Sequence, residues 1–510
     1  MKNFWVAIVA LLTLTLGFAG CDRYNDDDLW RELNEIKENI PEFSFDHSSN
    51  AGKVVIFNLN EIKKVKLNIK NLTDIQVLDK PENWKVDIAA DDSLVAIQAP
   101  SIKGKTFDKG TILLTAIDKK GNTLLASLKV CASLDFTDPD GTFVVTEGNM
   151  TSVNGSLVYY DKNGKEYKDV FENANDGLEI GNVVQDMFIA NERIYLLTQN
   201  GDRMGGAGRF VVCDARTLKL IYADPLNIKT PDGKDTWPQH MVIVNNNTAY
   251  IQYSEVGFEA TSGICKLTLS DKAVKVEQTV DGSFGAFTTT GATKTRMVYS
   301  RGKVYAGCGE SVIIINPAND SKIEKRVTFK GRQVKGIAKG ADNNLYIVAS
   351  GTFTGNANMG ATFTSNPIVV GLNHTGDIVH EQELSGIQLP VATWSPAVGL
   401  CASFTDPYLY FVDTDAFNAT SSSRYNYQTK KLDKNYVSGS ETIYGIMGEH
   451  PTTKKLWVAK STYVSSTIHV FDVTGASAKE EKRYSYPTQK GASPAGVDFA
   501  YRFTSKFIEK

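Results

Sequence analysis

Hydrophobic and polar residues alternate along much of this chain with the period of two that is typical of half-buried β-strands. The pattern begins near Phe43 and continues to Ser133, as in "WKVDIAADDSLVAIQA" and "GTILLTAIDKKGNTLLASLKV". The "KKGN" in the second of these segments predicts a hairpin turn. With a single Trp84, these short strands predict a small immunoglobulin-like β-sandwich over residues 42–135. Its expected role is a stalk for the rest of the chain.

A different period precedes the sandwich. Leu29, Leu33, Ile36 and Ile40 are spaced by four, three and four residues, which predicts a short helix over residues 28–40 that ends before Pro41. Two turns of heptad are too few to distinguish a coiled-coil stub from a spacer.

The remaining chain repeats one strand pattern seven times: "FVVTEGN" (143–149), "RIYLLTQN" (193–200), "TAYIQY" (248–253), "KVYAGCG" (303–309), "NLYIVAS" (344–350), "YLYFVDT" (408–414) and "KLWVAKS" (455–461). Each copy is followed by another strand and a turn, and six are preceded by a strand and a turn. The seventh preceding strand is found at the C-terminus, as "PAGVDFAYRF" (494–503).

Repeats of four antiparallel strands predict a β-propeller, because one blade cannot bury both its faces without neighbours. We therefore expect an all-β chain in which residues 142–510 form a seven-bladed β-propeller. The strand at the C-terminus is expected to complete the first blade and to remove an open edge.

The N-terminus predicts export. Residues 1–20 have the charge and the short apolar run of a signal peptide, and they end in Ala19 and Gly20 directly before Cys21. This order predicts a lipoprotein in which Cys21 carries lipid, followed by an acidic tether within residues 21–41. The alternative is an ordinary secretory signal with an incidental cysteine. Lipid is then the expected contact with the membrane, since no later run has the length of a transmembrane helix.

Charge and cysteine content exclude other classes. The formal net charge is −3 with no basic stripe, which gives a nucleic-acid partner no electrostatic support. The remaining cysteines show no C-x-x-C pair, so a zinc site or a disulfide framework is not indicated and buried positions are expected: Cys131, Cys213, Cys265, Cys308 and Cys401.

A binding site is expected on one face of the propeller, where the predicted connections are long and contain aromatic residues. Aligning the first strand of each blade places Asp186, His240, Arg296, Lys335, Val398, Tyr444 and Ala495 in one ring. The polar residues of this ring are candidate ligand-binding residues. Six nearby side chains complete the candidate set: Trp237, Tyr253, Phe284, Arg332, Trp394 and Tyr463. The alternative is that the ring residues pair with one another and close the channel.

An enzyme is not expected. Glu147, Asp186 and His240 would be the catalytic candidates, but the sequence has no nucleophile motif, no metal-ligand spacing and no phosphate loop. No catalytic residue, metal site or cofactor is therefore predicted.

The signal with Cys21, the acidic "DRYNDDD" and the opening propeller phrase "FVVTEGNMTSVNGSLVYYDKNGKEYKDVF" together resemble Bacteroidetes-type surface lipoproteins with YncE-like propellers. The resemblance implies display on the outer face of the outer membrane. It also implies capture of a ligand for a TonB-dependent transporter, with a corrinoid or another metal chelate favoured and a glycan next. The alternative is a surface module that binds a protein or matrix partner.

Overall fold

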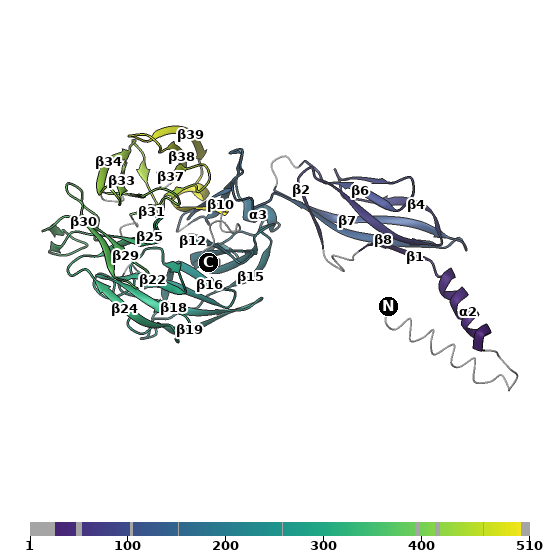
Figure 1. Cartoon of the computed structure of the whole chain (residues 1–510), viewed down its shortest axis with the longest axis horizontal. Coiled ribbons are helices and arrows are strands. Elements are labelled where there is room, and N and C mark those ends of the chain that lie inside the picture. The colour runs from purple at the N-terminus through teal and green to yellow at the C-terminus, as the bar shows by residue number, and fades with distance from the viewer. Residues whose placement is uncertain are drawn as a thin grey trace. The chain divides into compact units, whose positions relative to one another are not determined.

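The chain is described by a computed structural model, which covers residues 26–46, 54–101, 106–150, 152–257, 259–392, 398–413, 419–462 and 464–500. The signal peptide and Cys21 lie outside these residues. Contacts divide the chain into two compact units, residues 1–102 with 108–133 and residues 103–107 with 134–510. Both are built almost entirely of β-strands (Figure 1). Among the described residues, no helix is long and apolar enough to cross a membrane.

A helix opens the described chain. It is α2, Asp26–Asn39, and it begins two residues before the predicted start and ends one residue before the predicted end. Its last carbonyls would lack partners within the helix. Lys70 Nζ donates to the carbonyl of Lys37 at 3.2 Å and Asn71 Nδ2 donates to that of Glu38 at 2.6 Å, so the first unit caps this end.

The first unit is a β-sandwich of two four-stranded sheets that share one hydrophobic core. Trp84 is buried in this core, its ring meets that of Phe57 edge to face at 5.2 Å, and its Nε1 donates to Asp108 Oδ2 at 2.9 Å. The strands, in sheet order, are β1 (Glu42–Phe45), β3 (Ile62–Lys70), β6 (Leu94–Gln98) and β5 (Lys85–Ile88) in one sheet, and β2 (Val55–Asn58), β8 (Thr123–Ser133), β7 (Phe107–Asp118) and β4 (Leu72–Asp79) in the other.

The described residues of the second unit form seven antiparallel sheets with four main strand positions each, numbered here from first to seventh. The inner strand of each sheet is named first. The first sheet has β40 (Pro494–Phe499), β9 (Thr142–Thr146), β10 (Ser156–Tyr160) and β11 (Glu166–Tyr167); the second has β12 (Asn182–Ala190), β13 (Arg193–Gly201), β14 (Phe210–Asp214) and β15 (Leu220–Asp224); the third has β16 (Thr236–Asn245), β17 (Thr248–Glu255), β18 (Glu259–Leu269) and β19 (Val274–Thr279).

The fourth sheet has β21 (Val298–Ser300), β22 (Lys303–Cys308), β23 (Ser311–Asn316) and β24 (Lys322–Thr328); the fifth has β25 (Val334–Lys339), β26 (Leu345–Ala349), β29 (Ile368–Leu372) and β30 (Ile378–Glu383); the sixth has β31 (Cys401–Ala402), β32 (Tyr408–Phe411), β33 (Ser422–Asn426) and β34 (Lys431–Val437); the seventh has β35 (Thr442–Ile443) with β36 (Gly448–Glu449), β37 (Lys455–Ser461), β38 (Ser466–Asp472) and β39 (Lys479–Tyr486). Short additions are β20 (Gly285–Ala286), β27 (Phe353–Thr354), β28 (Thr362–Phe363), α3 (Val170–Ala174), η1 (Asp202–Met204) and η2 (Gln489–Gly491).

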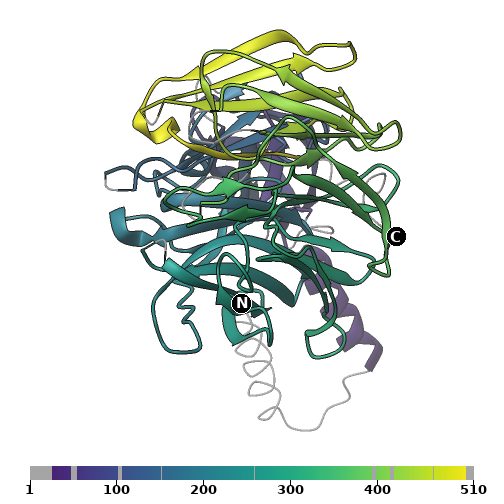
Figure 2. The same cartoon turned by 90° about the vertical axis from the view of Figure 1, so that its left-hand side faces the viewer.

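Each of these sheets is apolar on both faces, and a hydrophobic cluster fills the space between each sheet and the next. On β13, Ile194 and Leu196 pack toward the first sheet while Tyr195 and Leu197 pack toward the third. The inner strands contact one another in chain order, and the seventh sheet contacts β40 of the first. The result is a β-propeller-like unit, with successive sheets seen in Figure 2.

The cysteines lie in or beside the cores. Five lie in the described residues, and four of these are buried. Burial raises the pKa of Cys265 and of Cys308 to about 12, so neither carries a reactive thiolate at neutral pH.

The C-terminal strand joins the two ends of the second unit. As the sequence predicts, β40 pairs with β9, with Val497 opposite Val144 and Phe499 opposite Thr142. All six residues of β40 are buried, and Val497 and Phe499 contribute to the core between the seventh and first sheets.

A chain that ends at Ser493 therefore loses one strand of the first sheet and exposes the edge of β9. We expect the second unit to lose about 5 kcal/mol, because each large apolar side chain contributes about 1.5–3 kcal/mol when buried, and we expect it to aggregate through that edge. Thermal unfolding followed by circular dichroism, with size-exclusion chromatography, measures both effects. The control is a chain that ends at Ala500; equal melting temperatures for the two chains would contradict the role given to β40.

Candidate functional site

The two ends of the second unit differ in the length of their connections. At one end, each second strand turns into the third and each outer strand leads to the next sheet; we call this end the long-loop face. Its longest connections are residues 168–181, 225–235, 280–297, 350–367 and 384–400. The opposite end, the tight-turn face, has connections such as 191–192, 301–302 and 373–377. Ligand-binding residues are expected on the long-loop face, because long connections on a rigid scaffold are where function concentrates.

One predicted loop is mostly strand. Tyr253 was expected in a long loop, but β17 runs to Glu255 and β18 begins at Glu259. The hairpin is extended by β20, which pairs with β18 through Thr261 and Ser262. Extra hydrogen-bonded pairs thus lengthen the sheet where the sequence indicated a loop.

The inner strands carry matching β-bulges near the long-loop face. In β12, β16, β25 and β40 one extra residue interrupts the pairing with the second strand, and these residues are Gln185, Gln239, Lys335 and Ala495. Lys335 and Ala495 are therefore equivalent to Gln185 and Gln239, whereas Asp186 and His240 stand one residue later. The predicted ring mixed two positions, because equivalence is decided by the pairing with the second strand, which the sequence does not mark.

Three of the predicted ring residues meet at a buried ion cluster. Arg296 Nε donates to Asp186 Oδ1 at 3.0 Å, and its Nη1 lies 3.6 Å from Asp498 Oδ2 on β40. The amide of Met241 donates to Asp186 Oδ2 at 3.0 Å. Burial alone would raise the pKa of Asp186, but Arg296, His240 and this amide outweigh it and hold the pKa below its usual value. Asp186 is thus a buried carboxylate with its charge compensated.

His240 completes this cluster with a weaker contact. Its Nδ1 lies 3.3 Å from Asp186 Oδ2, which is longer than a typical hydrogen bond, and within the described residues neither buried ring nitrogen has a well-formed hydrogen bond. Burial lowers the pKa of His240 against the pull of Asp186, which favours a neutral ring. Gln252, opposite His240 on β17, is also buried and its side-chain amide also lacks partners.

A second polar group joins the first, second and seventh sheets. Glu147, which follows β9, accepts from Gln185 Nε2 at 2.8 Å and from the Tyr444 hydroxyl at 3.2 Å. Burial raises the pKa of Glu147, with Lys294 opposing, and burial lowers the pKa of Lys294, with Glu147 opposing. Glu147 and Lys294 were not in the predicted binding set; the sequence marked Glu147 only as a catalytic candidate.

Lys335 stands apart from these pairs. Its side chain is 8% exposed, and no hydrogen bond or ion pair within the described residues reaches it. Burial lowers its pKa to about 8. Of the ring positions that the sequence predicted, Lys335 is therefore the one that holds a buried cation without a carboxylate.

The predicted aromatic set is only partly available for binding. Tyr253 is fully buried between the second and third sheets, with its hydroxyl 2.7 Å from Thr279 Oγ1, so it offers no stacking surface, contrary to expectation. Phe284 packs partly against the same core, and Trp237 is half-buried in β16. Trp394 and Tyr463 lie outside the described residues.

Arg332 is occupied by backbone carbonyls. Its Nη1 donates to the carbonyls of Ser350 at 3.1 Å and Asn366 at 2.6 Å. Arg332 thereby holds the two ends of the connection 350–367 together, and its Nη1 is already used by these two carbonyls.

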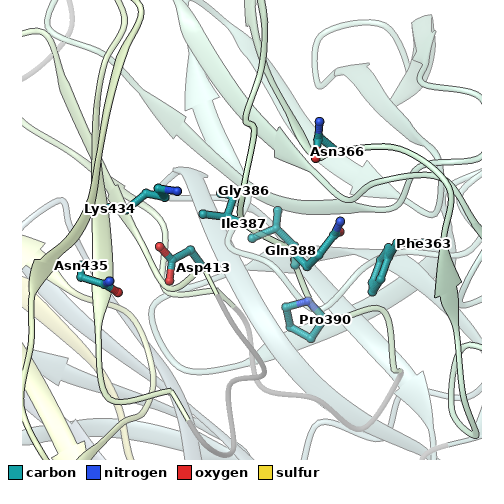
Figure 3. A pocket seen from close by; sticks show the side chains of 10 residues that line it. Phe363, Asn366, Gly386, Ile387, Gln388, Pro390, Asp413, Lys434 and Asn435 are labelled. Atoms are coloured by element: carbon teal, nitrogen blue, oxygen red, sulfur yellow. The ribbon is translucent and has the colours of Figure 1, made fainter.

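A cavity of about 600 Å³ opens on the long-loop face between the fifth and sixth sheets. Figure 3 shows the segment 386–390 crossing it, with Asp413, Lys434 and Asn435 toward one end and Phe363 toward the other. The other lining residues are Asn366, Gly386, Ile387, Gln388, Leu389 and Pro390. Asn366 links this cavity to the predicted residue Arg332.

Sequence reasoning identified the connections around this cavity but not its polar residues. Neither Asp413 nor Lys434 lies in a sequence context that marks a binding site. Asp413 follows a strand, and Lys434 lies in a charged outer strand. Only the pairing of β32, β33 and β34 brings them together. The one sequence feature that points to Asp413 is its place after an apolar strand, where a long connection begins. This feature is not specific to binding sites.

The charged groups near the axis and the groups that line the cavity differ in how they are paired. Within the described ranges, no three His, Cys, Asp or Glu side chains are arranged to hold a metal ion. The axial charges are mostly paired with one another, while the cavity combines apolar and hydrogen-bonding groups as ligand sites do.

Comparison with known proteins places most of the second unit in one family. The family model described as "Domain of unknown function (DUF5074)" matches residues 140–490. No curated protein matches the chain.

Solved structures resemble the chain at low identity. A quinoprotein alcohol dehydrogenase-like protein from Bacteroides thetaiotaomicron is 16% identical, with 90% of this chain and 99% of that chain covered and a TM-score of 0.49. An oligogalacturonate lyase in complex with manganese is 10% identical, with 76% and 97% covered and a TM-score of 0.38. Hsv2 from Kluyveromyces lactis is 9% identical, with 68% and 96% covered and a TM-score of 0.38. Scores below 0.5 carry no assignment of function to this chain.

The unpaired Lys335 gives a pH-dependent prediction. Its pKa falls from 10.5 in the unfolded chain to about 8, so between these values the folded protein binds fewer protons and gains stability as the pH rises. We expect Lys335→Met to be more stable than wild type at pH 7 by about 3 kcal/mol at most, from about 1.4 kcal/mol per pKa unit. The gain should shrink as the pH rises from 8 to 10.5.

Urea unfolding at several pH values measures this difference. Lys330→Met is the control, since Lys330 is exposed. A Lys335→Met variant that is less stable at pH 7, or a difference that does not change with pH, would show that the charge of Lys335 is compensated.

Proposed function

This chain belongs to the DUF5074 family, and we propose that it is a non-enzymatic protein that binds a ligand on the long-loop face of its second unit. The observation that carries the proposal is the cavity of about 600 Å³ between the fifth and sixth sheets. Its size lies within the range of about 300–1,000 Å³ that is usual for small-molecule sites. Its lining includes the buried Asp413, whose Oδ1 has no hydrogen-bond partner in the described part of the chain.

We propose that the second unit is a closed seven-bladed β-propeller and that the first unit is an immunoglobulin-like domain. The cyclic contacts of the inner strands and the pairing of β40 with β9 support the first assignment. The two-sheet core around Trp84 supports the second. In this arrangement the first unit acts as a stalk and the second carries the binding face.

We also propose that the protein is lipid-anchored through Cys21, displayed at the cell surface, and delivers its ligand to a TonB-dependent outer-membrane transporter. The small residues before Cys21 and the acidic segment after it support this location. The resemblance noted in the sequence favours a corrinoid or another metal chelate as cargo, with a glycan next.

A second candidate function is the binding of a protein or matrix partner. Exposed apolar side chains on the same face favour it: Met359 in the connection 350–367 is 86% exposed, and Val464 after β37 is 57% exposed. Such residues are common in interaction surfaces when they gather into a patch.

Ligand-dependent unfolding separates these functions. The chain from Asp22 onward is heated with corrinoids, haem, ferric siderophores and oligosaccharides in turn. A ligand present at a hundred times its dissociation constant should stabilise the second unit by about 2.7 kcal/mol and raise its melting temperature. If no compound class shifts the transition, while a protein partner does, the small-molecule proposal fails and the second candidate takes its place.

A further inference from the structure

The cavity on the long-loop face contains a carboxylate of which one oxygen accepts a hydrogen bond from the described residues and the other does not. Asp413 follows β32 and is 3% exposed. Its Oδ2 accepts a short hydrogen bond from the Ser423 hydroxyl, whereas Oδ1 has no hydrogen-bond partner among the described residues. Burial raises the pKa of Asp413, with Ser423 and Lys434 opposing. A buried acceptor without a donor is costly in a folded protein, so a donor from a ligand would be favourable here.

A second acceptor in the cavity wall is in the same condition. Gln388 belongs to the connection 384–400, and its Oε1 is buried without a hydrogen-bond partner. Neighbouring amides are already engaged: Asn366 Nδ2 donates to Glu383, and Asn435 Oδ1 accepts from Ser421 Oγ at 2.9 Å. The buried atoms of the wall that lack a hydrogen bond to the described residues, Asp413 Oδ1 and Gln388 Oε1, are thus both acceptors.

A cation stands beside the carboxylate. Lys434 on β34 is exposed, and it makes no hydrogen bond or ion pair with the described residues, although its charge opposes the rise in the pKa of Asp413. Lys434 Nζ comes close to the segment 386–390: a Cβ built on Gly386 would lie 2.8 Å from it. The cavity therefore presents the Lys434 ammonium, a donor, beside the acceptors Asp413 Oδ1 and Gln388 Oε1.

These charges restrict the ligand. Asp413 and Lys434 carry opposite charges, so together they give the cavity no net charge that would select an ion of one sign. The wall also has apolar parts, formed by Phe363, Ile387 and Pro390. The chemistry calls for a neutral group with several hydroxyl donors on one side and a C–H surface on another, and a pyranose ring has both.

Resting on the proposed binding function of the long-loop face, we propose that the cavity between the fifth and sixth sheets binds a neutral sugar ring. Its hydroxyls donate to Asp413 Oδ1 and Gln388 Oε1, one hydroxyl oxygen accepts from Lys434 Nζ, and its C–H face packs against Phe363. The ring belongs to a free monosaccharide or to the end residue of an oligosaccharide, since both present the same groups.

Calorimetric titration of the chain from Asp22 onward tests the proposal. The probes are glucose, galactose, mannose and N-acetylglucosamine, each with its methyl glycoside and a short oligosaccharide, together with glucuronate and galacturonate. We expect at least one neutral sugar to bind and its uronate to bind about tenfold more weakly or worse, because the carboxylate meets Asp413. Comparing the free sugar with the oligosaccharide identifies which form is the source.

Variants locate the site. Asp413→Asn keeps the shape but removes the charge, and loss of a hydrogen bond to a charged group should weaken binding about tenfold or more. Lys434→Ala, on an exposed side chain, should weaken binding without a folding defect, and it keeps the test open if the buried variant is unstable. Asp377→Asn makes the same chemical change as the first variant in a turn of the tight-turn face and should bind the sugar as wild type does.

The outcomes separate this inference from the proposed function. Binding of a corrinoid or chelate with no binding of any sugar overturns the sugar site and leaves the proposed function standing. Sugar binding that is unchanged in both Asp413→Asn and Lys434→Ala overturns the location. Equal affinity for a neutral sugar and its uronate overturns the role of Asp413. Sugar binding that is lost in the two cavity variants and kept in Asp377→Asn supports it.

Discussion

The packing of one sheet against the next is the constraint on which this protein depends. A four-stranded sheet with two apolar faces cannot be stable alone, because each face must be covered. In the second unit every sheet shares one cluster with the sheet before it and another with the sheet after it, as β13 does with Ile194 on one face and Tyr195 on the other. The C-terminal β40 supplies the inner strand that the first sheet needs. The strands are thereby fixed, and the connections at their ends are free to differ.

The axis of the second unit is lined by charged side chains, whereas the spaces between sheets are filled by apolar ones. At the axis, the inner strands bring charged side chains together, and these mostly neutralise one another, as Arg296 does with Asp186 and Asp498. A Cβ at Gly496 would lie 3.2 Å from Arg296 Nη2, so the small residue in β40 gives the guanidinium its space. Part of the predicted ring is therefore paired internally. This is the pairing of ring residues with one another that the sequence analysis gave as the alternative to ligand binding. Lys335 is the departure from this rule.

The strands could be predicted because their pattern is local. The repeated segments at 193–200 and 248–253 lie in β13 and β17, and the C-terminal segment pairs with β9 as expected, since alternation and turn residues are visible in a single sequence. The helix α2 was predicted to within two residues for the same reason.

What could not be predicted depends on register and on distant contacts. The strand pairing makes Lys335 equivalent to Gln185, the residue before Asp186, and this pairing with its one-residue bulges is not visible in a single sequence. Tyr253 was expected at the surface, yet the extension of β17 and β18 buries it. Asp413 and Lys434 come from different strands, so their meeting in one cavity depends on the pairing of the sixth sheet.

The central claim is that ligand binding belongs to the long-loop face between the fifth and sixth sheets and not to the axis or the first unit. Hydrogen–deuterium exchange of the chain from Asp22, with and without a ligand that stabilises it, tests this claim most directly. The account predicts slower exchange in residues 386–390 and 431–437, with no change in the turns 301–302 and 373–377 of the tight-turn face. Protection confined to the inner strands around Asp186 and Arg296, or to the first unit, would contradict it.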